Sequence, residues 1–418
     1  MTTLAEISTR WSMKRLADVF QTQLGKMLSE KSRTGFNPKP YLRNANVQWE
    51  RADVSNVYVM DFTEEEQRRF SVESGDLLMC EGGEIGRTCL WRGELSECYF
   101  QKAIHRLRPR STDVVPEFYL YWMEWAFRFA NLYGVTGTQT TIAHLPQEKL
   151  AELRVPVPST SEQRAIAHAV QTVQKAREAR QRELTLERES KAALMEYLFT
   201  KGTRGERVKR TEIGDTPESW NVLPMSKIAK IERGKFAHRP RNDPAYYGGT
   251  IPFVQTGDVT ASDGYVTKYS QTLNEKGLSV SRVFPKGTVL ITIAANIGFS
   301  AILEFDSAFP DSLIGITPNE RVEAEFLNYY LMTQQPEMDR RAPRGTQKNI
   351  NIEFLAPWQV PVPSLDEQRR IATVLHTCDR KIQSLRKETS LLTELFDAML
   401  QNLMTGRVSA SAFAGQTQ

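Results

Sequence analysis

The sequence Val155-Pro-Val-Pro-Ser159, followed by Glu162-Gln163-Arg164, occurs a second time as Val360-Pro-Val-Pro-Ser364 and Glu367-Gln368-Arg369. The two copies lie 205 residues apart (360 − 155 and 367 − 162), and this register holds without a gap as far as Thr200 and Thr405. A duplication of this length indicates two copies of one structural unit. We therefore expect a two-fold arrangement inside a single chain.

Identical residues continue along the repeated segment. They include the pairs Ile166/Ile371, Ala167/Ala372, Thr172/Thr377, Glu183/Glu388, Leu186/Leu391, Glu189/Glu394, Ala193/Ala398 and Leu198/Leu403. A weaker match extends into the preceding segments, where Gly137-Thr-Gln139 corresponds to Gly345-Thr-Gln347. The sequence therefore predicts the order variable module, helix, variable module, helix.

Size and composition favour a globular protein of more than one domain. The chain has 418 residues, of which 40% are hydrophobic and 25% charged, and its net charge is only +4. The four cysteines and five histidines show no metal-binding spacing, so we expect no metal site. The first residues lack the charged start and apolar core of a signal peptide, and no run approaches the ~18–20 apolar residues of a membrane span. We expect a cytoplasmic, reduced protein.

The repeated segments are predicted to be long helices with Ser159 and Ser364 as cap residues. In the second copy the apolar residues alternate at intervals of four and three, which is typical of a coiled-coil seam. In the first copy Arg177, Arg180, Glu187 and Lys191 occupy the equivalent seam positions. Either the helix rotates there, or those charges meet acidic groups of another chain. Two helices of about forty residues, each roughly 60 Å long, would pack most simply as an antiparallel pair.

Each variable module has the pattern of mixed α and β structure, with short β-branched strands and a buried helix after Pro116. The predicted fold class is α+β: two similar mixed α/β modules separated by two long helices that form an antiparallel coiled coil, in a pseudo-two-fold repeat. The predicted domains are residues 1–154 and 206–359 for the modules, 155–205 and 360–408 for the helical regions, and 409–418 for a flexible tail.

The sequence lacks the complete motifs of an amino-methylase, a metal-dependent nuclease or a nucleotide hydrolase. Asn242-Asp243-Pro244-Ala245-Tyr246 lacks the paired prolines of an amino-methylase box, and no glycine-rich loop for a methyl donor accompanies it. Glu189-Ser190-Lys191 has the form of a nuclease motif but falls inside a predicted helix. No phosphate-binding loop of the form Gly-x-x-x-x-Gly-Lys-Ser/Thr occurs. We therefore predict no catalytic residues.

Clusters of basic and amide residues occur in the variable modules. Arg, Asn and Gln side chains can read base edges, and Lys can contact phosphates. An exposed charge taken singly is more often an ordinary solvated residue, but the clusters together with the duplication favour DNA. The candidate DNA-binding residues are Arg43, Asn44, Asn46, Arg51, Gln139 and Thr140 in the first module, and Lys235, Arg239, Arg241, Gln255, Arg344, Gln347, Lys348 and Asn349 in the second.

With two different modules, each followed by a helical repeat that opens with Val-Pro-x-Pro and Glu-Gln, the chain resembles the specificity subunit of a Type I restriction–modification enzyme. The resemblance covers essentially the whole chain. It implies a non-catalytic reader of double-stranded DNA, in which each target-recognition module binds one half of an asymmetric bipartite target and the helices set the spacer.

The same resemblance implies which partners and cofactors to expect. Two modification (methyltransferase) subunits would dock on the helices and carry S-adenosylmethionine, giving Arg177, Arg180 and Lys191 a use as partner contacts. Restriction subunits would carry out ATP-driven translocation and cleavage with Mg²⁺. This chain itself would bind no cofactor.

A competing interpretation is a protein-interaction scaffold with two ligand-binding lobes on a coiled-coil strut, which the modest net charge favours. Binding that falls steeply with salt would instead favour DNA, because phosphate contacts release counterions. A third class, a self-contained enzyme, would require the methyl donor to bind this chain alone.

Overall fold

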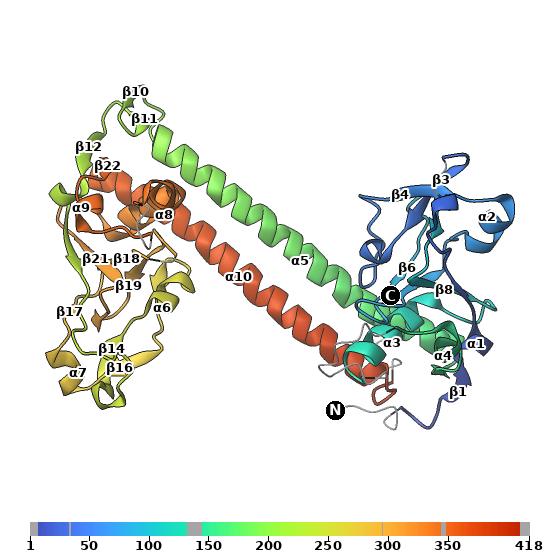
Figure 1. Cartoon of the computed structure of the whole chain (residues 1–418). Helices are drawn as coiled ribbons and strands as arrows, with labels where there is room; N and C mark the ends of the chain where they lie inside the picture. Colours follow the sequence, from blue (N-terminus) through green and yellow to red (C-terminus); the bar gives the residue numbers. More distant parts are fainter. Residues whose placement is uncertain (1–6, 33–34, 132–143, 295, 344–347, 410–418) are drawn as a thin grey trace, which may run out of the picture. The chain divides into compact units, whose positions relative to one another are not determined.

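A computed structural model describes residues 7–32, 35–131, 144–294, 296–343 and 348–409 of the chain (Figure 1). The chain divides into two compact units. The first unit consists of Met1–Arg180 with Glu388–Gln418, and the second unit of Gln181–Lys387. Each unit thus combines one module with part of each of two long helices, α5 (Thr160–Lys201) and α10 (Leu365–Leu403).

The first unit is built around a four-stranded antiparallel sheet with the order β2-β8-β5-β6 and a three-stranded sheet with the order β4-β3-β7. Its strands are β1 (Ser12–Arg15), β2 (Phe20–Leu24), β3 (Pro38–Leu42), β4 (Tyr58–Asp61), β5 (Leu77–Cys80), β6 (Thr88–Leu90), β7 (Tyr99–Phe100), β8 (Ile104–Pro109) and β9 (Arg154–Val157). Its shorter helices are α1 (Leu16–Val19), η2 (Glu30–Ser32), η3 (Asn44–Asn46), α2 (Glu64–Phe70), α3 (Pro116–Arg128) and α4 (Gln147–Ala151).

The second unit repeats this plan with a five-stranded sheet, β13-β21-β18-β19-β15, and a four-stranded sheet, β16-β14-β20-β17. Its strands are β10 (Val208–Thr211), β11 (Gly214–Pro217), β12 (Asn221–Pro224), β13 (Ala229–Arg233), β14 (Tyr247–Phe253), β15 (Tyr265–Val266), β16 (Gln271–Leu273), β17 (Val283–Phe284), β18 (Val289–Thr292), β19 (Ser300–Leu303), β20 (Ser307–Ala308), β21 (Leu313–Pro318) and β22 (Gln359–Val362). Its shorter helices are η4 (Met225–Lys227), η5 (Pro244–Tyr246), α6 (Thr256–Thr260), α7 (Glu275–Ser279), α8 (Ala324–Arg341) and α9 (Ile352–Leu355).

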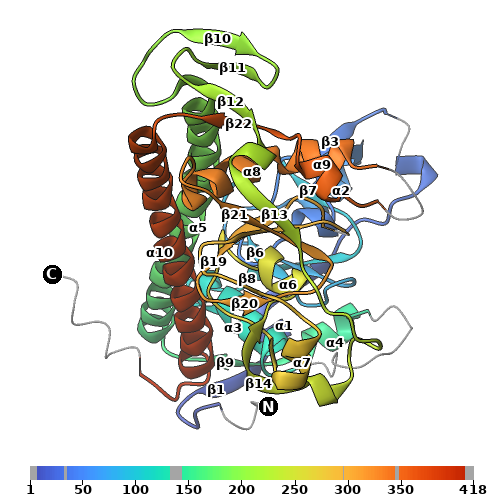
Figure 2. The same ribbon diagram turned by 90° about the vertical axis from the view of Figure 1, so that its left-hand side faces the viewer.

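The duplication predicted from the sequence is confirmed in the strand order. The order β2-β8-β5-β6 of the first unit corresponds to β13-β21-β18-β19 of the second, and the antiparallel pair β1–β9 corresponds to β12–β22. The second unit adds the β10–β11 hairpin, which lies beside β12 and β22 (Figure 2). The predicted fold class, α+β with two similar modules, is therefore confirmed.

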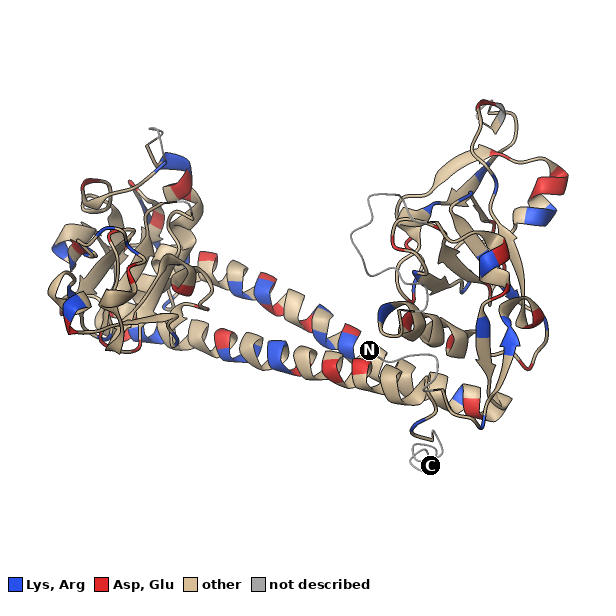
Figure 3. Ribbon diagram, turned by 60° about the horizontal axis from the view of Figure 1, so that its bottom comes forward, with Lys and Arg blue, Asp and Glu red and all other residues tan. Residues whose placement is uncertain are grey.

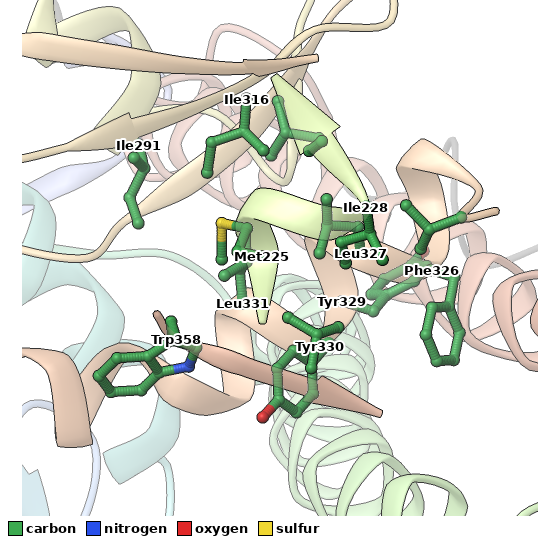
Figure 4. Packing of buried hydrophobic residues seen from close by; sticks show 14 of the residues in the cluster. Met225, Ile228, Ile291, Ile316, Phe326, Leu327, Tyr329, Tyr330, Leu331 and Trp358 are labelled. Atoms are coloured by element: carbon green, nitrogen blue, oxygen red, sulfur yellow. The ribbon is translucent and has the colours of Figure 1, made fainter. Parts of the chain in front are cut away.

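Each unit has its own apolar core, in which one amphipathic helix covers the sheet. In the second unit α8 contacts β18 and β19, and its Phe326 and Tyr330 are buried in the same cluster as Ile291 of β18 and Ile316 of β21 (Figure 4). In the first unit α3 contacts β6, and all residues from Phe118 to Ala126 are buried. Full burial of a side chain of this size contributes about 1.5–3 kcal/mol, so these two helices are major stabilising elements of their units.

The repeated Glu-Gln motif joins each module to its long helix. Gln163 donates to the Pro158 carbonyl oxygen (2.9 Å) and accepts from the backbone N–H of Val115 (2.9 Å), directly before α3. Gln368 repeats both bonds, to Pro363 (2.9 Å) and from Glu323 (2.8 Å), directly before α8. The motif recurs because each copy satisfies the backbone at the start of a buried helix.

The Val-Pro-Val-Pro segments themselves are strands rather than helix starts. β9 pairs with β1 and β22 pairs with β12, and the helices begin at Thr160 and Leu365. The predicted domain limits at 154/155 and 359/360 therefore fall within strands, and they stay a prediction. None of the described helices combines the length and apolar character that crossing a bilayer requires.

In each unit the segments of α5 and α10 run antiparallel, as predicted. In the second unit Glu183 pairs with Lys381 (2.7 Å), whereas Lys191, further along α5, pairs with the earlier residue Asp379 (2.5 Å). In the first unit Arg180 pairs with Glu388 (2.9 Å), and Arg177 lies over the ring of Phe396. A small apolar seam in the second unit is formed by Leu184, Ile382 and Leu385.

Candidate nucleic-acid interface

The loop before β14 holds two of the predicted arginines. Arg239 is 3.2 Å from Asp311, and Arg241 forms an ion pair with the same carboxylate. Both arginine side chains remain about half exposed. One carboxylate can neutralise only one of their two positive charges. Lys235 is also exposed. The loop therefore presents positive charge to solvent.

Arg241 and Gln255 line one hollow in the second module, with a volume of about 380 Å³. Gln255 donates to Gln271 (2.8 Å), and the partly exposed Tyr247 lines the hollow together with the buried Phe236 and Phe253. Guanidinium and amide groups can pair with base edges, and aromatic rings can contact a base face or a thymine methyl group. The hollow thus combines the chemistry that base recognition requires.

Gln271 and Tyr247 were not among the residues predicted from the sequence. Gln271 reaches the hollow because β16 pairs with β14 in a register that sets it opposite Phe253. This register is a long-range property that no local motif encodes. The local signal that could have identified it is the change from exposed Gln271 to buried Leu273 along a short strand.

The residues around the second Gly-Thr-Gln have separate contacts. Lys348 is 2.8 Å from Asp339 of α8, and exposed Asn349 forms a backbone bridge to Ala294. Arg344 and Gln347 lie outside the described residues, as do Gln139 and Thr140 of the first module. DNA contacts by these four residues stay predictions.

In the first module, Arg43 and Asn46 hold a loop together. The Arg43 guanidinium lies 3.5 Å from the centre of the Tyr58 ring and donates to the Asn56 carbonyl oxygen (3.2 Å). Asn46 is only 3% exposed, and its amide bonds to the backbone of Arg43, Asp53 and Asn56. Its predicted role as a base contact is corrected here, because the whole amide is used inside the loop.

The other two predicted residues of this loop, Asn44 and Arg51, differ in accessibility. Asn44 is partly exposed as a residue, but its side-chain nitrogen donates to the Gly82 carbonyl oxygen (3.0 Å) and its Oδ1 is buried. Arg51 is exposed at the end of the loop. The segment Asn44–Arg51, which we call the first recognition loop, is closed by the bridge between Val47 and Ala52.

The seam charges of α5 meet groups of this same chain, so the alternative of acidic groups on another chain is wrong for them. Lys191 is 8% exposed, pairs with Asp379 and lies over the ring of Tyr329 (5.1 Å). Arg177 lies over Phe396 (4.3 Å) and 3.5 Å from Glu50. Both residues have acidic partners within the chain, and their use as contacts of another subunit stays a prediction. Arg180 pairs with Glu388, and both side chains remain 45% exposed.

The described residues hold no group of three or more His, Cys, Asp or Glu side chains suited to a metal ion. His105 is buried against the Leu145 carbonyl oxygen (2.8 Å), and burial lowers the pKa of its imidazole, as expected of a structural residue. Burial raises the thiol pKa of Cys80, which disfavours the thiolate form. Along α5 and α10 acidic and basic residues alternate (Figure 3), which matches the small net charge.

Comparison with known proteins identifies the family. The sequence matches the Type I restriction modification DNA specificity domain twice, over residues 9–188 and 217–394. The chain belongs to this specificity-domain family. The two matched segments are the two halves of the internal repeat, so the duplication is a duplication of the specificity domain.

Relatives of this specificity-domain protein match it along nearly its whole length. The putative type I restriction enzyme MjaX specificity subunit of Methanocaldococcus jannaschii is 25% identical over 97% of this chain and 96% of its own. The MjaVIII specificity subunit of the same organism is 23% identical over 80% of this chain and 79% of its own. The solved Type I restriction-modification S subunit from M. genitalium has the same fold, with a TM-score of 0.59 and 16% identity over 96% of this chain and 98% of the other.

Proposed function

We propose that this chain is the DNA sequence-specificity subunit of a Type I restriction–modification complex and that each module reads one half of a bipartite target. The observation that carries the proposal is the presence of two DNA specificity domains in one chain, on the same scaffold but with different loops. In the second module the hollow around Arg241 and Gln255 supplies base-edge chemistry. In the first module Asn44 and Arg51 belong to the recognition loop.

The two half-sites should differ in sequence. Tyr41–Val47 of the first module and Phe253–Val259 of the second occupy corresponding places in the repeat. The apolar residues at the two ends of the segment are similar, but Arg43 and Asn44 correspond to Gln255 and Thr256. In the second module this segment forms α6, and in the first it forms η3. Different side chains on one scaffold present different donors and acceptors, so the target is asymmetric.

The helices provide the spacer and the docking surface for two modification subunits. Leu186, an exposed residue of α5, has the identical and likewise exposed counterpart Leu391 on α10. The pairs Glu189/Glu394 and Ala193/Ala398 are likewise identical and exposed. Residues three, four and seven apart share a helix face, so α5 and α10 carry the same outward stripe. A repeated stripe suits two copies of one partner.

The chain itself would be non-catalytic and cytoplasmic. S-adenosylmethionine would be bound by the modification subunits, and ATP and Mg²⁺ by the restriction subunits. Of the three predicted partner contacts, Arg177, Arg180 and Lys191, the side chain of Arg180 is the most exposed.

The proposal is tested by mapping adenine methylation in a genome that expresses this chain with its neighbouring modification subunit. We expect a gapped, two-part motif. Arg241→Ala should relax or abolish one half of the motif and leave the other half unchanged. Arg282→Ala is the matched control, since Arg282 is an equally exposed ion-paired arginine of the same module. An assembled complex that produces no new methylated motif would instead support the interaction-scaffold function.

A further inference from the structure

A buried group of charges lies where the first recognition loop meets the helices of the first unit. Glu50, the residue before Arg51, is 7% exposed and has a positive φ of 70°. Its backbone N–H donates to the Thr88 carbonyl oxygen (3.0 Å), and its own carbonyl oxygen accepts from Arg92 (3.2 Å). These bonds hold the end of the loop in a conformation that non-glycine residues rarely adopt.

The Glu50 side chain connects the loop to α5. Its Oε1 lies 3.5 Å from a guanidinium nitrogen of Arg177, whose other face packs on the Phe396 ring of α10. Arg51 directly follows Glu50, so the contact with Arg177 and the backbone bonds of Glu50 fix the chain immediately before Arg51. The loop and the helix pair are thus coupled through one contact.

The surroundings of Glu50 disfavour its charged form. Glu124 of α3 and Glu178 of α5 face it with negative charge, whereas Arg177 and Arg92 face it with positive charge. Burial, followed by the charge of Glu124, raises the pKa of Glu50 to about 8. Glu124 is itself occupied by an ion pair with Arg128, which also lies 3.9 Å from Asp397 of α10. Glu50 therefore changes protonation state close to neutral pH.

We propose that Glu50 and Arg177 are positioning residues that lock the first recognition loop onto α5, and that this lock makes reading of the first half-site dependent on pH. The inference rests on the proposed function, because it takes the loop as a DNA contact. Bound DNA brings phosphates close to the loop, and negative charge favours the neutral form of a carboxyl group. Binding of the first half-site is thus accompanied by proton uptake, and its affinity falls as the pH rises above 8.

The second unit provides an internal control. The repeat sets Ile382, a buried apolar residue, at the position equivalent to Arg177. The loop after α6 is joined to α10 by an ion pair between Asp263 and Arg386, but both of these side chains are substantially exposed. Reading of the second half-site should therefore lack this pH dependence.

The test measures the affinity of the complete complex with its modification subunits between pH 7 and 9. It uses duplexes that keep one half of the mapped target and scramble the other. For the wild-type chain we expect affinity for the first half-site to fall above pH 8, by no more than about tenfold per pH unit because one proton is exchanged. Affinity for the second half-site should stay constant, which also shows that each variant is folded.

Three variants separate positioning from a merely structural role. Glu50→Gln keeps the shape of the neutral acid, so the pH dependence should disappear. Arg177→Gln removes the cation that favours the carboxylate, so the fall should move to higher pH. Arg15→Gln is the control, since Arg15 is an ion-paired arginine of the same unit whose partners are Asp18 and Glu152, and it should behave as wild type.

Three outcomes would overturn the inference: a flat wild-type profile, an unchanged profile in Glu50→Gln, or equal effects of the Arg177 and Arg15 substitutions. These outcomes leave the proposed function intact as long as the wild-type complex discriminates its target from scrambled DNA. Failure of that discrimination at every pH would remove the proposed function, and the inference with it.

Discussion

Replacing Asp379 by alanine should destabilise the second unit far more than replacing a surface carboxylate of the same helix. Asp379 accepts from Lys191 (2.5 Å) and from the hydroxyl of Tyr329 (2.6 Å). Removing it leaves the ammonium group of Lys191, a residue that is only 8% exposed, without its counter-ion. Breaking a buried pair in this way costs about 3–5 kcal/mol.

The measurable effect follows from the size of the unit. For a domain of about 200 residues, 1 kcal/mol shifts the melting temperature by about 2–4 °C, so Asp379→Ala should lower it by about 6–20 °C. Glu388→Ala, on the same helix, breaks the half-exposed pair with Arg180 and should cost about 0–1 kcal/mol. Thermal unfolding, with hydrogen exchange followed peptide by peptide, assigns the loss to the second unit.

A double variant checks the reasoning. Lys191→Met combined with Asp379→Leu removes both charges, so it should regain more than half of the stability lost in Asp379→Ala, because apolar replacements of a buried pair are close to neutral. Equal losses for Asp379→Ala and Glu388→Ala would refute the view that the contact is buried and charged. So would a double variant that is as unstable as the single one.

Three further predictions concern the two long helices and the buried carboxyl group of Glu50. Leu186→Glu or Leu391→Glu should each reduce the modification subunits bound from two to one, as measured by native mass spectrometry, whereas Val374→Glu, on an exposed position without an identical counterpart, should not. Deleting one matched heptad from α5 and α10 shortens the pair by about 10 Å, so the spacer in the methylated motif should contract by about three base pairs; an unchanged spacer would mean that the helices do not set it. Because the pKa of Glu50 is raised from 4.5 to about 8, the free energy of unfolding of the first unit should fall as the pH rises through that window, and Glu50→Gln should remove this slope in denaturant titrations.

The two-fold scaffold could be predicted from the sequence because its signals are local and repeated. The constant register from Val155 to Thr200 and from Val360 to Thr405 shows the duplication without any knowledge of contacts. Heptad spacing likewise indicates which face of α10 is buried. These properties depend on neighbours three to seven residues away, and both proved correct.

The partners of individual charged residues could not be predicted in the same way. Arg239 and Arg241 share Asp311, which is about seventy residues away in the sequence. Asn46 has the composition of a base-reading residue, but the loop closes around its amide. Whether a polar side chain faces solvent or its own backbone depends on loop closure, which residue type and spacing do not determine.

The contrast between the two faces of the long helices links the fold to the proposed assembly. In an ordinary duplicated coiled coil, packing would preserve the buried seam and leave the exposed face free to vary. In the middle of the helices the seam has diverged, with Lys191 opposite Asp379 in one unit and its counterpart Phe396 against Arg177 in the other. Nearer the helix ends buried pairs such as Ile166/Ile371 and Leu198/Leu403 are identical, and packing accounts for them. The exposed residues Leu186 and Leu391 are identical as well. Packing does not require this identity, whereas a stripe that meets two copies of one partner must present the same surface twice.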